Sequence, residues 1–245
     1  AEFKPGGHWT RSLLASPDGR KLYAGVGSLS NIGESGMAAE EGRAAIYELD
    51  LASGTSRIFA SGLRNPVGLA WEPRTGTLWT AVNERDGLGD ETPPDYLTSV
   101  RDGGFYGWPY CYWGQTVDDR VPQDPAAVAK AITPDYALGG HTASLGLCWL
   151  PAETLPGFPE GMAIGQHGSW NRSTLSGYRV VFVPFAIVTK SYDDYLEMVR
   201  APFREIGVEV EGLHRADRAE EAVGSAGAIV VGGGNTWRLV RELRL

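Results

Sequence analysis

The sequence has little of what marks nucleic-acid-binding, membrane-spanning or hydrolytic proteins. Its 245 residues carry 22 Lys and Arg against 30 Asp and Glu, so there is no basic excess to follow a phosphate backbone. No apolar run approaches the roughly 18 residues of a membrane span, and no GxSxG, HExxH or CxxC motif occurs. We therefore expect neither a nucleic-acid partner nor a membrane span, and hydrolase or zinc chemistry has no positive support.

Cysteines and leader signals are also scarce. The two cysteines, Cys111 and Cys148, permit one disulfide or two buried free thiols, and they do not decide the redox compartment. The chain begins at Ala1 with neither an initiator Met nor an apolar leader, which predicts a soluble chain that is processed or cut. Glycines 232–234 precede no helical pattern, so we interpret them as a turn rather than a phosphate loop.

Glycine, proline and aromatic residues are abundant. The chain has 33 Gly, 15 Pro, 8 Trp, 10 Tyr and 7 Phe, which suits many short strands joined by tight turns. The best helical pattern is short, at residues 192–199. A polar turn with Gly precedes an apolar run four times, which predicts an all-β fold of four repeated units. The turns and runs are 16–19 with 21–26, 74–76 with 77–82, 159–161 with 162–165, and 225–227 with 228–231.

The stretch 61–110 concentrates the residues suited to chemistry. Pro66 biases Asn65 toward an extended conformation, so Arg64 and Asn65 are predicted at the mouth of a strand. Strands are predicted at 67–71 and 76–82, around a turn with Pro and Gly. An acidic loop follows, with Asn83, Glu84, Arg85, Asp86, Asp90, Glu91 and Asp95. A later polar stretch, 116–138, is interpreted as a solvated loop insertion.

Several motifs together carry a family resemblance. They read GGHWTR, EEGRAAIYELD, LRNPVGLAW, NERDGLGDETPPDY, GGFYGWPY, HTASLGL and HGSWNR, in that order along the chain. The sequence resembles the soluble pyrroloquinoline-quinone-dependent sugar dehydrogenases, and more closely their sorbosone dehydrogenase-like branch. The resemblance spans most of residues 6–185 and becomes poor after about residue 200.

The resemblance implies a six-bladed β-propeller, of which this sequence supplies about four blades. We therefore expect residues 1–245 to form one partial propeller domain that lacks the family's N-terminal blades. Each blade buries its face only against a neighbour, so an incomplete arc leaves apolar faces open. A homo-oligomer could cover those faces, or four blades could close on themselves.

The resemblance also implies catalytic roles. His8 matches the family's general base, which takes a hydroxyl proton as hydride leaves the sugar carbon. Arg64 and Asn65 match the groups that stabilise negative charge on the quinone oxygen. From the residues alone, a lone His is more typical of a structural or exposed position, and Arg64 could instead pair with the acidic loop.

The acidic loop is the expected calcium site. Short-spaced oxygen donors suit Ca²⁺, which takes six to eight oxygen ligands. The resemblance places carbonyl ligands at Glu84 and Arg85, where better-known members have Gly-Pro. Asp86, Asp90 and Asp95 could bind a further ion or be ordinary solvated loop acids.

Cofactor anchors are expected in the HGSWNR motif and beyond it. Pyrroloquinoline quinone carries three carboxylates, so Asn171 and Arg172 are candidate anchors, with His167 in the same loop and Arg218 further on. The implied function is a quinoprotein dehydrogenase, with Ca²⁺ beside the quinone, a sugar or aldehyde-hydrate substrate and an external electron acceptor. The implied location is periplasmic or secreted. The alternatives are a calcium-dependent propeller lactonase and a sugar-binding propeller without turnover.

Overall fold

The computed structural model describes residue 3 and residues 5–154, 156, 159–184, 197, 200 and 204, with the backbone alone at 180–184. The chain divides into two compact units, residues 1–148 with 164–180 and residues 149–163 with 181–245. The fourth repeat at 225–231, the turn at 232–234 and Arg218 lie outside the described residues, as does nearly all of the expected helix at 192–199.

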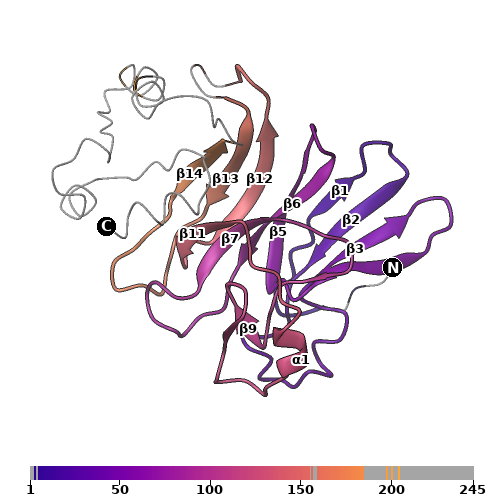
Figure 1. The fold of residues 1–245 in the computed structure, drawn as a ribbon, viewed down its shortest axis with the longest axis vertical. Helices are drawn as coiled ribbons and strands as arrows, with labels where there is room; N and C mark the ends of the chain where they lie inside the picture. Colours follow the sequence, from indigo (N-terminus) through magenta and orange to yellow (C-terminus); the bar gives the residue numbers. More distant parts are fainter. Residues whose placement is uncertain are drawn as a thin grey trace. The chain divides into compact units, whose positions relative to one another are not determined.

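The first sheet contains the first repeated unit. Its order is β1 (Leu13–Ala15), β2 (Lys21–Val26), β3 (Ala45–Asp50) and β4 (Ser56–Ser61), all antiparallel, and β8 (Gly104–Phe105) adds a parallel edge to β4 (Figure 1). The turn before β2 forms because Ser16 Oγ donates to Asp18 Oδ1 at 2.6 Å and Gly19 takes the left-handed conformation at φ 69°. The strand expected at 21–26 is therefore confirmed.

The second sheet carries the stretch that the sequence marks for chemistry. Its order is β11 (Tyr136–Gly140), β7 (Pro94–Ser99), β6 (Thr77–Asn83) and β5 (Asn65–Glu72). The Glu72 carboxylate accepts from the backbone N–H groups of Arg74 and Thr75 at 2.6 and 2.9 Å and so forms the predicted β5–β6 turn. Asn65 and Asn83 are register partners at the opposite end, which places Arg64 beside the start of the acidic loop.

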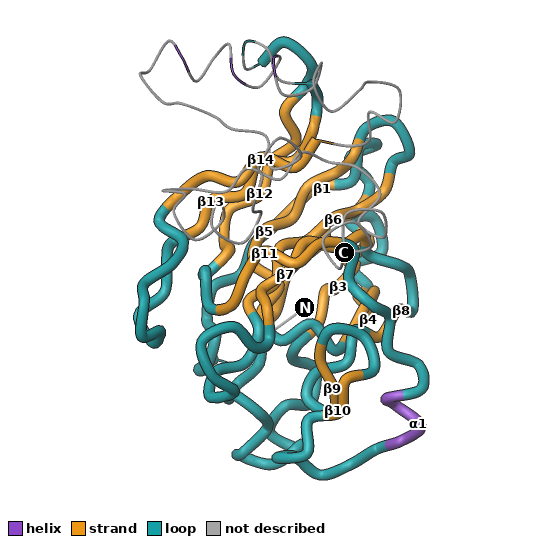
Figure 2. The backbone as a smooth tube through the Cα atoms, turned by 60° about the vertical axis from the view of Figure 1, so that its left-hand side comes forward, coloured by secondary structure: helices purple, strands orange, loops and turns teal. Residues whose placement is uncertain are grey.

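The third sheet has the order β12 (Ser144–Leu150), β13 (Gly161–Gln166) and β14 (Arg179–Pro184). Within the described residues, the other elements with assigned bounds are a two-stranded ribbon, β9 (Cys111–Tyr112) and β10 (Thr116–Val117), and one short helix, α1 (Pro125–Val128) (Figure 2). The all-β prediction is confirmed. In the described part of the chain, three of the four repeats are present as strands, each in its own open sheet. A count of six blades stays a prediction.

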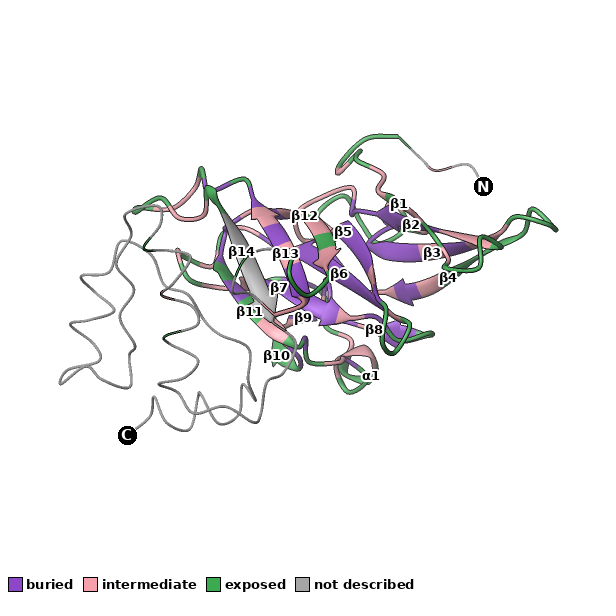
Figure 3. Cartoon of the chain, turned by 90° about the horizontal axis from the view of Figure 1, so that it is seen from above, coloured by how far each residue is buried: buried purple, intermediate pink, exposed green. Residues whose placement is uncertain are grey.

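The core joins the first two sheets. Tyr23 of β2 packs edge-on against Phe59 and Trp71 with ring centroids 5.2 Å apart in both pairs. The buried members of this cluster are Tyr23, Ile46, Ala60, Leu63, Leu69, Leu78, Val82, Tyr96, Val100 and Tyr106. Burial accordingly concentrates along β2, β3, β5, β6 and β7 (Figure 3). This shared core holds the strand ends that carry Arg64, Asn65 and the acidic loop.

One sequence interpretation needs correction here, and the alternatives left open for the two cysteines are decided. The loop at 116–138 is not simply solvated, because Asp118, Val121 and Ala131 within it are buried. Cys111 and Cys148 form no disulfide, and of the two free thiols only that of Cys111 is buried. Within the described residues, no helix has the length and apolar character needed to cross a membrane.

Candidate functional site

His8, Arg64 and Asn65 meet at one corner of the fold. The backbone of Ser28 links two of them, since His8 N donates to Ser28 O at 3.0 Å and Ser28 N donates to Arg64 O at 2.7 Å. Gly27 lies between the side chains of His8 and Asn65. A Cβ at position 27 would stand 2.4 Å from Asn65 Oδ1 and 2.5 Å from His8 Cβ. The corner therefore needs glycine at 27, and it brings together the three residues expected to be catalytic.

His8 has the geometry of a base. Its Nδ1 lies 3.0 Å from both Ser28 O and Ser28 Oγ. A proton on Nδ1 that is donated to the carbonyl leaves the Nε2 lone pair free to accept a proton. Burial, and secondarily the positive charge of Arg64, lower the pKa of His8, which favours the neutral ring.

The guanidinium of Arg64 is buried, and each of its three nitrogens donates a hydrogen bond within the chain. Its Nη1 donates to Glu84 O at 2.7 Å, its Nη2 donates to Asn31 Oδ1 at 2.9 Å, and its Nε donates to Asn31 O at 3.2 Å. Burial lowers the pKa of Arg64, but an arginine remains charged at any pH of interest. These contacts fix a cation beside His8 and the loop that follows β6.

The carboxylates of the acidic loop diverge instead of gathering. Asp86 accepts from Arg64 Nη2 at 3.4 Å and from Asn171 Nδ2 at 2.8 Å. Asp90 turns to Ser173, whose backbone N–H donates to it at 3.1 Å. Asp95 is buried and accepts from the backbone N–H of Glu84 at 2.9 Å. Among the described residues, no three His, Cys, Asp or Glu side chains form a group that could hold a metal ion.

Glu84 and Arg85 point into the protein. Burial raises the pKa of Glu84 to about 7, and its Oε1 has no hydrogen-bond partner. Arg85 pairs with Asp118, with Nε 2.9 Å from Oδ2 and both side chains buried. The carbonyl of Glu84 already accepts from Arg64. A calcium ion on that carbonyl would stand beside a guanidinium, so the residues present here do not fit the calcium site that the resemblance implies.

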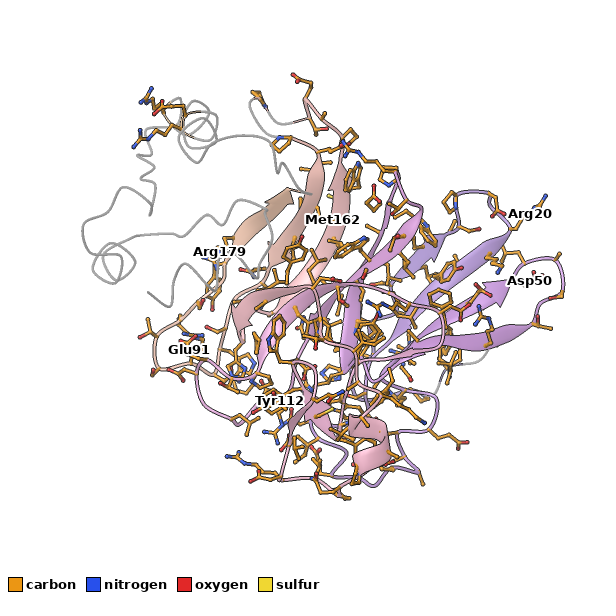
Figure 4. All side chains as sticks on the ribbon, in the orientation of Figure 1. Arg20, Asp50, Glu91, Tyr112, Met162 and Arg179 are labelled. Atoms are coloured by element: carbon orange, nitrogen blue, oxygen red, sulfur yellow. The ribbon has the colours of Figure 1, made fainter. Side chains whose placement is uncertain are left out.

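The HGSWNR loop ties neighbouring loops together. Arg172 Nη1 donates to Asp90 O at 2.8 Å and to Gly140 O at 3.0 Å, and its Nη2 pairs with Glu91, labelled in Figure 4. Its guanidinium is therefore engaged with the chain itself, although the sequence suggests a cofactor anchor. His167 is exposed, and the Trp170 side chain in the same loop is 82 % exposed.

Two residues of the site carry no assigned role in the sequence analysis. Asn31 accepts a hydrogen bond from Arg64 through Oδ1 and donates one through Nδ2 to Asp86 O at 3.1 Å. His141 places Nδ1 3.3 Å from Asp86 Oδ1 and Nε2 2.8 Å from Gly89 O. His141 stands in the motif HTASLGL, which was a usable signal, whereas nothing local in the sequence distinguishes Asn31.

Comparison with protein-family models divides the chain near residue 170. Residues 2–171 match the family described as Glucose / Sorbosone dehydrogenase. Residues 170–245 match a different one, Peptidase family S51. A stretch of 65 residues is 44 % identical to a Peptidase E of Nostoc sp. This stretch is 26 % of this chain and 27 % of that protein.

Solved structures support the fold of the longer part. The holo form of the pyranose dehydrogenase PQQ domain from Coprinopsis cinerea is similar with a TM-score of 0.61 and 25 % identity, over 76 % of this chain and 55 % of that one. A calcium structure of the Trichoderma reesei carbohydrate-active enzyme family AA12 gives 0.62 and 22 %, over 75 % and 55 %. The chain thus spans about half the length of the relatives that it matches in this part.

Proposed function

This chain belongs to the Glucose / Sorbosone dehydrogenase family over residues 2–171, and from that premise we propose that it serves a quinone-dependent oxidation of a sugar or an aldehyde hydrate. The family membership confirms the resemblance seen in the sequence. The observation that carries the proposal is the convergence of His8, Arg64 and Asn65 around Gly27. A base, a fixed cation and an amide in one corner are what hydride abstraction from an alcohol carbon needs.

The donor set of this corner fits pyrroloquinoline quinone. When bound, that cofactor supplies the hydride acceptor. The fixed guanidinium of Arg64 supplies positive charge where an acceptor oxygen becomes negative, and the amide of Asn65 supplies a hydrogen-bond donor at the same corner. Because Arg64 is already held by Glu84 O and Asn31, it needs little reorganisation.

The proton is the part of the reaction that this chain's residues handle directly. In the proposal, Nε2 of His8 accepts the substrate hydroxyl proton while Nδ1 stays bonded to Ser28 O. The lowered pKa of His8 keeps the base unprotonated at neutral pH. A calcium ion belongs to the family resemblance, but it does not fit the carbonyl of Glu84, and we route no step through it.

Four further parts of the proposed function rest on the family resemblance alone. They are a small sugar or aldehyde substrate, an external electron acceptor, a periplasmic or secreted location and a six-bladed propeller of which this chain holds a part. The lactonase alternative needs a carboxylate-lined metal, and the described residues gather none. A sugar-binding propeller without turnover remains the rival that an experiment must separate.

The match at 170–245 bears on domain organisation. The prediction of a single propeller over 1–245 places the fourth repeat and Arg218 in this segment, which resembles another family. We propose that the propeller part ends near residue 184, where β14 ends, and that the remainder is a separate segment. Arg218 accordingly has no place in the proposed site.

Reconstitution tests the proposal. The full chain is titrated with pyrroloquinoline quinone, followed by absorbance, and dye reduction is then measured over a panel of sugars and aldehydes. We expect saturable quinone binding and substrate-dependent bleaching that is lost in His8→Ala, while Asp119→Asn, an exposed site, serves as the control. Binding of sugar with no bleaching in any condition would favour the rival without turnover.

A further inference from the structure

The acidic loop at residues 84–91 is matched by cations and amides of the same chain. Asp86 is the centre of this arrangement: Arg64 Nη2 approaches its Oδ2 at 3.4 Å, and Asn171 Nδ2 donates to its Oδ1 at 2.8 Å. The backbone N–H of Asp86 donates to Asn31 Oδ1 at 2.8 Å, and the same oxygen accepts from Arg64. Both carboxylate oxygens therefore face donors from distant parts of the chain.

His141 joins the same carboxylate to the loop backbone. Its Nδ1 lies 3.3 Å from Asp86 Oδ1 and its Nε2 lies 2.8 Å from Gly89 O, so each ring nitrogen faces an oxygen acceptor. The ring can donate to both only when both nitrogens carry protons. The His141 side chain is buried and that of Asp86 is 38 % exposed, so this link is partly shielded from solvent.

A further cation holds the outer end of the loop. Arg172 donates to the carbonyl of Asp90 at 2.8 Å and pairs with Glu91. Its second carbonyl acceptor, Gly140, lies at the end of β11, so the loop is joined to the second sheet. The loop is therefore anchored at Glu84, Asp86, Gly89 and Asp90 by side chains from outside it.

We propose that these internal cations order the loop in place of a metal ion, and that Asp86 is a positioning residue that fixes the guanidinium of Arg64. Calcium requires six to eight oxygen ligands, whereas the oxygens of Asp86 are directed at Arg64, Asn171 and His141. A divalent ion at this carboxylate would be repelled by the guanidinium. The ordering of the loop stands without the proposed function, and only its effect on quinone binding rests on it.

Trp108 can report on the position of Arg64, because both side chains donate to the same backbone oxygen. The carbonyl oxygen of Asn31 accepts from Arg64 Nε at 3.2 Å and also from the indole Nε1 of Trp108 at 3.0 Å. A shift of Arg64 changes the competition for that oxygen. The indole N–H resonance of Trp108 therefore reports on the position of Arg64 without any cofactor or turnover.

The experiment uses the full chain as wild type, Asp86→Asn, Asp86→Glu and the exposed control Asp119→Asn. Indole N–H resonances are recorded by ¹H–¹⁵N NMR, with Trp108→Phe for assignment. We expect Asp86→Asn to shift the Trp108 resonance and to weaken quinone binding roughly tenfold, and we expect Asp86→Glu to restore both in part. Thermal midpoints in CaCl₂, MgCl₂ and chelator should coincide for the wild type at matched ionic strength.

Two results would overturn the proposal. One is a saturable rise of the wild-type midpoint specific to Ca²⁺ that Asp86→Asn removes, because Asp86 would then be a metal ligand. The other is a Trp108 resonance that neither Asp86 variant moves. Absence of quinone binding to the wild type would contradict the proposed function alone, since the NMR and metal measurements need no quinone. If Asp86→Asn fails to fold, the Trp108 resonance of Asp86→Glu and the wild-type thermal midpoints in CaCl₂, MgCl₂ and chelator still test the proposal.

Discussion

The buried ion pair between Arg85 and Asp118 gives the sharpest stability prediction. Arg85 Nε lies 2.9 Å from Asp118 Oδ2, and the two side chains are 4 % and 3 % exposed. Asp118→Asn removes one charge and leaves the other buried, which typically costs about 3–5 kcal/mol. The Nε–H of Arg85 is not aligned for a hydrogen bond, so we expect the lower end, about 3 kcal/mol.

That loss is measurable by thermal and urea unfolding. For a domain of this size, about 3 kcal/mol corresponds to a midpoint roughly 6–12 °C lower. Asp119→Asn makes the same charge change one residue along at an exposed position and should stay within about 0.5 kcal/mol of wild type. The double variant Arg85→Met with Asp118→Leu should recover most of the loss, because apolar replacement of a buried pair is often neutral.

An Asp118→Asn variant as stable as Asp119→Asn would contradict this prediction. That result would mean that the 116–138 insertion does not support the loop after β6, despite the burial of Asp118. A double variant as unstable as the single one would instead show that packing, not the unpaired charge, dominates the loss. The two outcomes are distinguished by the same set of unfolding curves.

Three further predictions follow from the site. Gly27→Ala should destabilise the chain by about 1–3 kcal/mol and weaken quinone binding, because the new Cβ meets Asn65 and His8; unfolding curves and quinone titration check it. His8→Ala should cut dye reduction by about 10²–10⁴-fold with quinone affinity nearly unchanged. Glu84 binds a proton more tightly in the folded state, where its pKa is about 7, so wild-type stability should fall between about pH 4.5 and 7. Glu84→Gln should remove that fall, on the order of 3 kcal/mol, in unfolding measured across pH.

The sequence predicts local structure well where turn chemistry is specific. Ser16, Asp18 and Gly19 mark the turn before β2, and Pro66 marks the strand that carries Asn65. These signals depend on neighbours along the chain, so they can be interpreted without the fold. The convergence of His8 with Arg64 could be expected only from the family resemblance, because 56 residues separate them.

The acidic loop shows why the rest could not be predicted. Seven residues with charged or amide side chains among the thirteen at 83–95 predict a metal site when only the neighbours along the chain are considered. Asp86 contacts Arg64, His141 and Asn171, which lie 22, 55 and 85 residues away along the chain.

 Those separations arise from strand pairing and loop contacts, which the sequence does not state locally. Asp118 was missed for the same reason, since an Asp in a polar loop carries no sign that an arginine will meet it in the interior.

The three arginines around this loop show how the same side chain serves different ends. Arg64 presents its charge to the corner that holds His8, Arg85 is buried against Asp118, and Arg172 joins the outer loop to β11. Arg64 and Arg172 use the planar guanidinium to donate to carbonyl oxygens in fixed directions, which a lysine cannot reproduce, whereas Arg85 is held by the charge of Asp118. The acidic run therefore has much less free negative charge than its composition suggests. The Asp86 carboxylate is 38 % exposed and the Arg64 guanidinium 3.4 Å from it is 6 % exposed, so a ligand entering this corner meets a carboxylate whose charge is offset by a buried cation, which disfavours a metal ion.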